Sequence, residues 1–118
     1  MKATIKQKED VLVFLMKGDL TSEFVNDFES KLKNELKRGA KKILIVMDAV
    51  SRIDDIGYQI LGSCMAASNR NGTNFVLYFE NPDRLEQFNQ SSYAEFFNIV
   101  TDMGDAKREL SKPRRKQK

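Results

Sequence analysis

The segment that decides the fold is Asp48-Ala-Val-Ser-Arg-Ile-Asp-Asp-Ile-Gly57. It follows an apolar run at residues 43–47 and precedes a helical pattern of apolar residues. Three acids and a glycine are therefore expected between the end of a buried strand and the start of the next helix. In α/β domains, ligands and partners usually bind at this edge of the sheet.

The residues on either side of this segment predict a parallel sheet. The uninterrupted apolar run at residues 43–47 is typical of a parallel strand that is covered on both faces. After the acidic segment, apolar residues recur every three to four positions, which indicates a helix that ends near Asn71 and Gly72. Residues 74–79 are predicted to form the next buried strand. The inward stripe of the helix is expected to contain Ile56, Ile60, Cys64 and Ala67, with Leu61 beside it.

The N-terminal part predicts a hairpin followed by a helix. Residues 11–16 read as a strand, and residues 3–8 are expected to pair with it through a turn at residues 9–10. Residues 18–21 are predicted to break this strand. Thr21 is the predicted N-cap of the following helix, in which Glu23 in the first turn suits the helix dipole. Gly39 is expected to end that helix. Its core stripe is predicted to be Phe24, Val25, Phe28, Leu32 and Leu36.

The C-terminal part predicts two more helices and one short strand. Residues 81–83, Asn-Pro-Asp, are a strong helix start, because they combine a capping side chain, proline at the first helical position and an acid in the first turn. Residues 97–101 are predicted to form a last short strand. Asp102 should then cap a helix that runs through Leu110.

The predicted order of elements is therefore β-β-α-β-α-β-α-β-α. Strand–helix–strand connections imply parallel pairing with right-handed crossovers. We expect a single α/β domain at residues 1–110, with a mostly parallel central sheet, an N-terminal hairpin strand and about four helices. Residues 111–118 contain no apolar side chain and are expected to be a basic disordered tail.

Composition limits the class of protein. No run approaches the roughly 18 apolar residues of a membrane span, and no signal peptide is recognised, so we expect a cytoplasmic protein. The lone Cys64 fits that expectation and rules out an internal disulfide. The net charge of +3 hides an uneven distribution. Residues 107–118 carry seven Lys or Arg and one Glu, whereas residues 1–106 carry 13 basic and 16 acidic residues, a net charge of −3.

These motifs together resemble the STAS domains, a family named for sulphate transporters and anti-sigma-factor antagonists. The family hallmark is an apolar strand that ends in Asp, then a second apolar-Asp pair that usually continues as Asp-Ser-Ser-Gly or Asp-Ser-Thr-Gly at the start of a helix. Here residues 45–48 read Ile-Val-Met-Asp, and residues 53–57 read Ile-Asp-Asp-Ile-Gly. Residues 18–21 resemble the Gly-acid-Leu turn of the family, and residues 97–106 resemble its closing strand and helix.

The resemblance implies a protein-binding domain and not a catalyst. In bacterial antagonists of this family, the domain binds an anti-sigma factor that is often a serine kinase. The kinase phosphorylates the first serine of the loop, the modified domain releases its partner, and a phosphatase resets it. Other members of the family are subunits of lipid-transport, stress-signalling or anion-transport assemblies.

This sequence departs from the family pattern at the phosphoacceptor position, which carries Asp55. A carboxylate cannot become a serine phosphate, and it carries less charge than phosphoserine. Two alternatives follow: Asp55 holds the domain in a phosphorylated-like state, or a partner binds this acid directly. Residues 18–21 and 51–57 are expected to lie side by side, because both follow the C-terminal ends of parallel strands. The residues expected at the partner-binding surface are Asp19, Thr21, Ser51, Asp54, Asp55, Ile56 and Gly57. Asp48 is expected to shape the loop, and Asp54 also to cap the helix.

The expected function is therefore that of a regulator resembling an anti-sigma-factor antagonist. Its expected partner is an anti-sigma factor or a serine-kinase-like protein, and it is expected to be a monomer or a weak homodimer. We expect no cofactor, no small-molecule substrate and no nucleic acid, although the basic tail leaves nucleic acid open. The main alternative is a non-switching STAS subunit of a transport or stress-signalling complex.

Two chemical alternatives start from the same acids. Asp48, Asp54 and Asp55 together suit a magnesium site, since this ion prefers oxygen ligands. Phosphoacceptor receiver domains also use clustered acids, but they have an acid pair after their first strand and a lysine after their last, and both are missing here. The chain has no histidine and no other pairing of a nucleophile with a base, so an enzyme is not expected.

Overall fold

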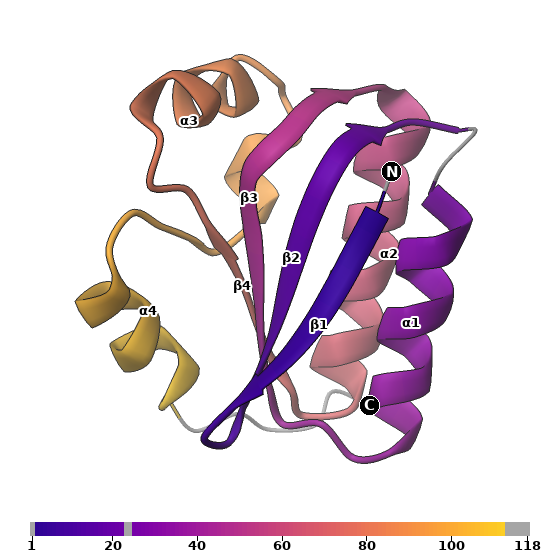
Figure 1. The fold of residues 1–118 in the computed structure, drawn as a ribbon, viewed down its shortest axis with the longest axis vertical. Coiled ribbons are helices and arrows are strands. Elements are labelled where there is room, and N and C mark those ends of the chain that lie inside the picture. The colour runs from indigo at the N-terminus through magenta and orange to yellow at the C-terminus, as the bar shows by residue number, and fades with distance from the viewer. Residues whose placement is uncertain (1, 23–24, 113–118) are drawn as a thin grey trace.

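The computed structural model describes residues 2–22 and 25–112, and their elements follow the predicted order (Figure 1). The strands are β1 (Lys2–Lys8), β2 (Val11–Leu20), β3 (Lys42–Ile53), β4 (Asn74–Tyr78) and β5 (Ile99–Val100). The α-helices are α1 (Val25–Lys37), α2 (Asp55–Arg70), α3 (Pro82–Asn89) and α4 (Met103–Leu110), with a short 3-10 helix, η1 (Ala94–Phe96), between α3 and β5.

The five strands form one mixed sheet in the order β1-β2-β3-β4-β5. β1 is antiparallel to β2, and the other three pairs of neighbours are parallel. The predicted hairpin is confirmed, because Lys8 pairs with Val11 and Glu9 takes the positive φ of 55° that the tight turn requires. The predicted α/β class with a mostly parallel sheet is likewise confirmed.

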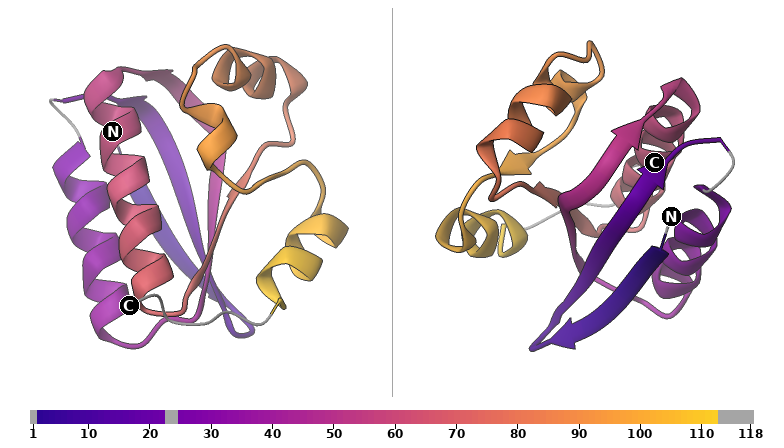
Figure 2. Two further views of the ribbon diagram at one scale, coloured as in Figure 1. Left: turned by 180° about the vertical axis from the view of Figure 1, so that it is seen from behind. Right: turned by 45° about the horizontal axis from the view of Figure 1, so that its top comes forward.

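Helices cover the sheet unequally on its two faces. α1 and α2 lie side by side against one face, whereas α4 packs against β4 and β3 on the other (Figures 1 and 2). The larger apolar core lies under α1 and α2, where the rings of Phe14 and Phe28 meet edge to face. A smaller core joins Leu44 and Val76 to Leu110 of α4. None of the helices in the described ranges is long and apolar enough to cross a bilayer.

Two strands are longer than the sequence predicts. β2 continues through Gly18 to Leu20, and β3 continues past Met47 to Ile53. Each extension supplies the backbone hydrogen-bonding partners of the other, with irregular register at two points, and Gly18 takes a φ of 101° there. The prediction that residues 18–21 break the strand was therefore wrong, and so was the placement of Asp48 at a strand end.

The buried stripe of α2 also differs from the predicted one. Ile56 is 42% exposed and Ile60 is only half-buried. The side of the helix that faces the sheet carries Gly57, Leu61, Cys64, Ala67 and Ser68. The inward face is thus rotated toward Leu61, and Ile56 is free to contact a partner. Burial raises the pKa of the Cys64 thiol to about 12, in keeping with its predicted place in the core.

Several predicted helix ends are confirmed. Gly39 follows α1 with a φ of 92°, and its N–H donates to the Leu36 carbonyl. The Asn81 side chain accepts from Asp83 N–H at 2.9 Å, as a cap of α3 should. The Asp102 carboxylate caps α4 by accepting from the third residue of that helix at 2.8 Å. The predicted cap at Thr21 and acid at Glu23 concern the start of α1, where residues 23–24 lie outside those described.

The C-terminal segment is tied to the sheet further than its composition suggests. The side-chain amide of Asn74 donates to the carbonyl oxygens of Leu110 (2.7 Å) and Lys112 (2.9 Å). The first two residues of the predicted tail, 111–112, are therefore anchored through their backbone. Residues 113–118 lie outside the described part. The last strand, β5, is shorter than the predicted 97–101.

Candidate functional site

The ends of β2 and β3 and the start of α2 meet at one edge of the molecule, as predicted. Asp54 N–H donates to the Leu20 carbonyl at 3.3 Å, and Asp19 pairs with Arg52 in the β2–β3 register. We call this surface the α2 edge, and it comprises residues 18–22 and 51–57. Segments more than thirty residues apart in the sequence are joined here because both parallel strands end at the same side of the sheet.

Asp54 caps α2 and also ties it to the end of β2. Its Oδ1 accepts from Gly57 N–H at 2.8 Å, and its Oδ2 accepts from Ser22 N–H at 3.1 Å. These two backbone hydrogen bonds hold the pKa of the Asp54 carboxyl below its usual value of 3.8. Both oxygens are thus engaged within the chain, which makes Asp54 chiefly an organiser of the α2 edge.

Gly57 lets the first turn of α2 approach the end of β2 very closely. A Cβ atom at this position would lie 2.0 Å from the Leu20 carbonyl oxygen and 2.9 Å from Cγ2 of Ile53. No side chain fits at such distances without movement of the backbone. The glycine therefore fixes the spacing between the helix start and the strand ends.

Asp55 and Ile56 are the exposed residues in the first turn of α2, within the α2 edge. Asp55 is the first residue of α2 and is exposed, and among the described residues nothing forms a hydrogen bond or ion pair with its carboxylate. The positive end of the helix dipole favours an acid at this position. Together the two residues present a fixed negative charge beside an aliphatic side chain.

The other residues that the sequence predicts at this surface have different environments. The carboxylate of Asp19 lies 3.4 Å from the guanidinium of Arg52, an exposed pair of the kind that adds little stability. Thr21 is only 6% exposed, so little of it is open to contact. Ser51 is exposed on β3. Arg52 was not predicted as a surface residue of the site, although its position beside Ser51 in the sequence could have suggested it.

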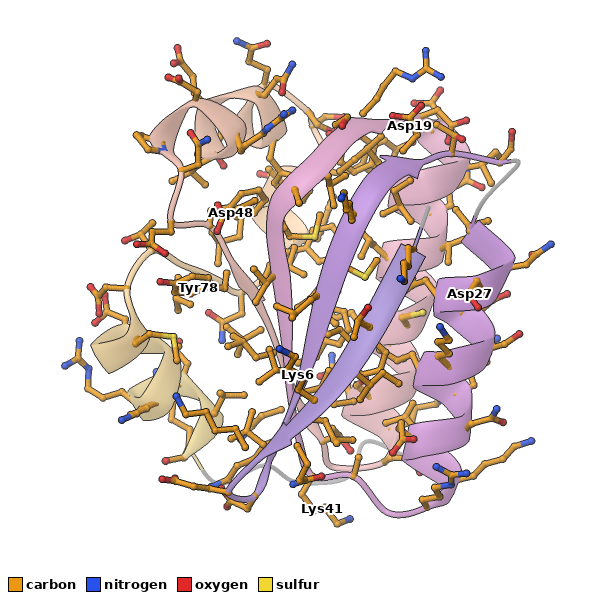
Figure 3. The ribbon with its side chains drawn as sticks, viewed as in Figure 1. Lys6, Asp19, Asp27, Lys41, Asp48 and Tyr78 are labelled. Carbon is orange, nitrogen blue, oxygen red and sulfur yellow. The ribbon has the colours of Figure 1, made fainter. Side chains whose placement is uncertain are left out.

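Asp48 lies away from the α2 edge (Figure 3). Its Oδ1 accepts from the N–H groups of Glu80 (2.9 Å) and Asn81 (2.8 Å), so it holds the loop before α3. It does shape a loop, but not the one in which the sequence placed it. Asp54 lies six positions further along the chain, about 20 Å along an extended strand. A joint magnesium site is therefore not supported, and the described residues contain no cluster of three potential metal ligands.

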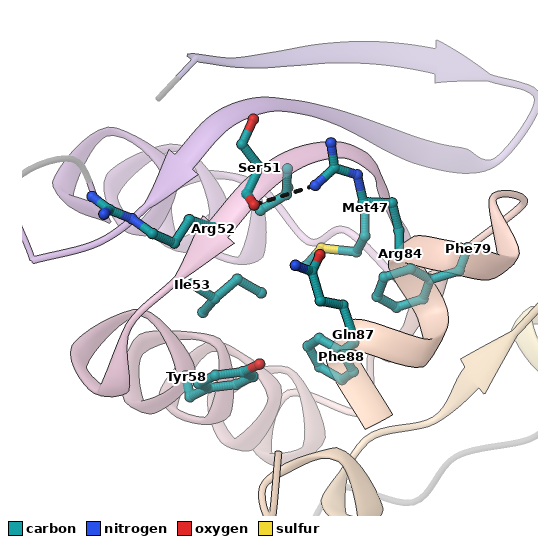
Figure 4. A pocket seen from close by; sticks show the side chains of 10 residues that line it. Met47, Ser51, Arg52, Ile53, Tyr58, Phe79, Arg84, Gln87 and Phe88 are labelled. Carbon is teal, nitrogen blue, oxygen red and sulfur yellow. Dashed lines mark hydrogen bonds between the residues drawn. The ribbon is translucent and has the colours of Figure 1, made fainter. Parts of the chain in front are cut away.

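A cavity of about 170 Å³ adjoins the α2 edge, between β3, α2 and α3 (Figure 4). The sequence did not predict this cavity, because only the folded chain brings α3 next to β3 and α2. Nη1 of Arg84 donates to the Ser51 carbonyl at 3.2 Å and so links α3 to β3 across its rim. The lining residues are Met47, Val50, Ser51, Arg52, Ile53, Tyr58, Phe79, Arg84, Gln87 and Phe88.

The family model of the STAS domain matches residues 2–106. This chain belongs to the STAS domain family. The match includes all five strands, the α2 edge and the cavity lining. No curated protein gave a significant match to the sequence.

Solved structures with a similar fold include several anti-sigma factor antagonists. A putative anti-sigma factor antagonist from Thermotoga maritima is 20% identical, with a TM-score of 0.79 and coverage of 93% of this chain and 95% of that one. An anti-sigma factor antagonist from Mycobacterium paratuberculosis is 14% identical, with a TM-score of 0.78 and coverage of 94% of both chains. The phosphorylated form of the Bacillus cell fate determinant SpoIIAA is 16% identical, with a TM-score of 0.65 and coverage of 91% of this chain and 98% of that one. At these identities, the likeness concerns the fold.

Proposed function

We propose that this STAS domain is a non-enzymatic regulator that acts in the cytoplasm by binding an anti-sigma factor or a related kinase through the α2 edge. Asp55 takes the place of the phosphoacceptor serine, so the charge at this position is permanent. The observation that carries the proposal is the exposure of Asp55 and Ile56 at the start of α2, on a surface held in place by Asp54 and Gly57.

The surroundings of Asp55 favour a role in contact over a role in folding. The neighbouring carboxylate, Asp54, accepts two backbone N–H groups, whereas the described residues give Asp55 no such partner. An acid in the first turn of a helix contributes only about 0.3–1 kcal/mol through the dipole. The carboxylate of Asp55 is therefore available to a cation on a partner.

The experiment begins with a pull-down from the native cell, in which mass spectrometry identifies the partner. An anti-sigma kinase among the captured proteins supports the regulator. A transporter ATPase or a signalling scaffold supports the second candidate, a non-switching STAS subunit, which the loss of the phosphoacceptor hydroxyl favours. Calorimetric titration of the wild type and the Asp55→Ser and Asp55→Asn variants then measures the contribution of the charge.

The two roles of Asp55 predict opposite results. If Asp55 contacts a partner cation, both variants bind about 10–150-fold more weakly, the range expected for a hydrogen bond to a charged group. If Asp55 mimics phosphoserine, Asp55→Ser binds the kinase more tightly and becomes a substrate for it. Asp83→Ser removes an exposed acid from the first turn of α3 and is the matched control, with unchanged affinity expected. Equal affinities for all four proteins would contradict both roles.

A further inference from the structure

We propose that the cavity between β3, α2 and α3 is a binding site for a small organic anion, namely a carboxylate on an apolar or aromatic group of about ten non-hydrogen atoms. This inference concerns the isolated domain and does not depend on the proposed function.

The walls of the cavity are apolar and aromatic. The ring centroids of Phe79 and Phe88 lie 5.1 Å apart. The ring centroid of Tyr58 lies 5.5 Å from that of Phe88. Met47 and Ile53 complete this part of the wall (Figure 4). Ligand sites are typically lined in this way, with a few polar groups that fix the orientation of the ligand.

The polar groups at the cavity are cationic or neutral. Arg52 and Arg84 line it, together with Ser51 and Gln87, and none of the lining residues among those described is acidic. The positive charge of the lining contrasts with the net charge of −3 that residues 1–106 carry as a whole. The acids on α3, at positions 83 and 86, lie outside the lining. The cavity therefore offers a cationic rim in a mildly acidic domain.

Arg84 is the residue best placed to bind the anion. Its guanidinium has five N–H donors, of which one reaches the Ser51 carbonyl. Within the described residues, no carboxylate pairs with it. Arginine binds carboxylates through two parallel N–H groups, so the free donors of this half-buried side chain suit a ligand carboxylate. Arg52 is less available, because Asp19 lies 3.4 Å away.

The size of the cavity limits the ligand. An apolar protein cavity of about 150 Å³ takes up benzene. At about 170 Å³, this cavity has room for one ring or branched chain, and its lining includes Arg52 and Arg84 for the charged group. A nucleotide or a lipid with long chains is larger than this volume.

The test uses the full chain, with phenylacetate as the probe and phenylacetamide as its neutral analogue of the same size. Two-dimensional NMR titration should show saturable shifts at the amides of Val50, Ile53 and Tyr58. The expected dissociation constant for phenylacetate is about 1 mM or lower, given the binding energy available to about ten atoms. Phenylacetamide, measured on the same wild-type protein, should bind at least about ten-fold more weakly because it lacks the charge.

Substitutions then test whether Arg84 is the residue that binds the carboxylate of the probe. Arg84→Gln should weaken phenylacetate binding at least about ten-fold. Arg70→Gln, which removes an exposed arginine from the far end of α2, should leave binding unchanged. Four results would overturn the proposal: no saturation by about 10 mM, equal affinity for acid and amide, shifts confined to other parts of the domain, or inorganic phosphate binding as well as phenylacetate. If Arg84→Gln does not fold, the comparison of acid with amide on the wild type still decides.

Discussion

Gly57→Ala tests whether the close contact between α2 and β2 is as tight as the structure indicates. The added methyl would lie 2.0 Å from the Leu20 carbonyl oxygen, whereas carbon and oxygen atoms in a close non-bonded contact stay about 3.3–3.6 Å apart. The helix start or the strand end must therefore move by roughly 1.3 Å or more. Such a movement also strains the hydrogen bonds of Asp54 to Gly57 and to Leu20.

The magnitude follows from two opposing effects. Alanine is favoured over glycine by up to about 1 kcal/mol in a helix, which on its own would stabilise the variant. Overpacking at a tight contact costs about 1–3 kcal/mol and occasionally more, and the strained hydrogen bonds add about 0.5–1.5 kcal/mol each. We expect a net loss of roughly 1–5 kcal/mol in the free energy of unfolding. This corresponds to a fall in Tm of about 4–20 °C for a domain of this size.

Gly62→Ala is the matched control, because Gly62 lies in the same helix and a Cβ there meets nothing within 4 Å. This variant should gain about 0.5–1 kcal/mol from helix propensity alone. Urea unfolding and thermal melts of the wild type and both variants measure the difference. A Gly57→Ala variant as stable as Gly62→Ala would refute the reasoning, since it would mean that the contact relaxes at no cost.

Three further predictions concern hydrogen bonds. Asp48→Ala removes the acceptor of two backbone N–H groups before α3 and should lower the free energy of unfolding by about 1–3 kcal/mol. Urea titrations measure this loss. The control variant, Asp83→Ala at an exposed position, should unfold like the wild type. Asp54→Asn keeps a capping side chain but loses the charge, which stabilises the fold above pH 3.8 because the pKa of Asp54 is lowered in the folded state. The difference in the free energy of unfolding between wild type and variant should therefore shrink as the pH falls through this lowered pKa. A difference that stays constant with pH would contradict this. Truncation after Lys112 should leave Tm nearly unchanged. Truncation after Leu110 removes the Lys112 carbonyl, which accepts a hydrogen bond from the Asn74 side chain, and should lower the free energy of unfolding by about 0.5–1.5 kcal/mol. Equal Tm values for the two truncated proteins would show that this hydrogen bond does not stabilise the fold.

The order of elements could be predicted because each depends on local patterns. Apolar runs at residues 43–47 and 74–79 indicated parallel strands, and capping residues before α3 and α4 marked where those helices begin. The meeting of residues 18–21 with residues 51–57 followed from the parallel order alone. These features need no knowledge of side-chain packing.

The features that the sequence did not reveal depend on contacts between distant residues. The extension of β3 has Ala49, Ser51 and Arg52 at its exposed positions and only Val50 at a buried one, so its pattern resembles a loop. It is a strand because β2 pairs with it. The bonds from Asp48 to the loop before α3, and from Arg84 to Ser51, each span more than thirty residues and leave no periodic signal. The cavity was missed for the same reason, since α3 contributes Arg84, Gln87 and Phe88 to its wall.

The buried Cys64 makes the domain convenient for site-specific labelling. Its thiol is the only one in the sequence, it is fully buried, and its pKa of about 12 leaves almost no thiolate at neutral pH. A cysteine introduced at an exposed position such as Gln59 would react with a maleimide dye or cross-linker while Cys64 does not. The native sequence can therefore carry a fluorescent reporter near its candidate surface without first being made cysteine-free.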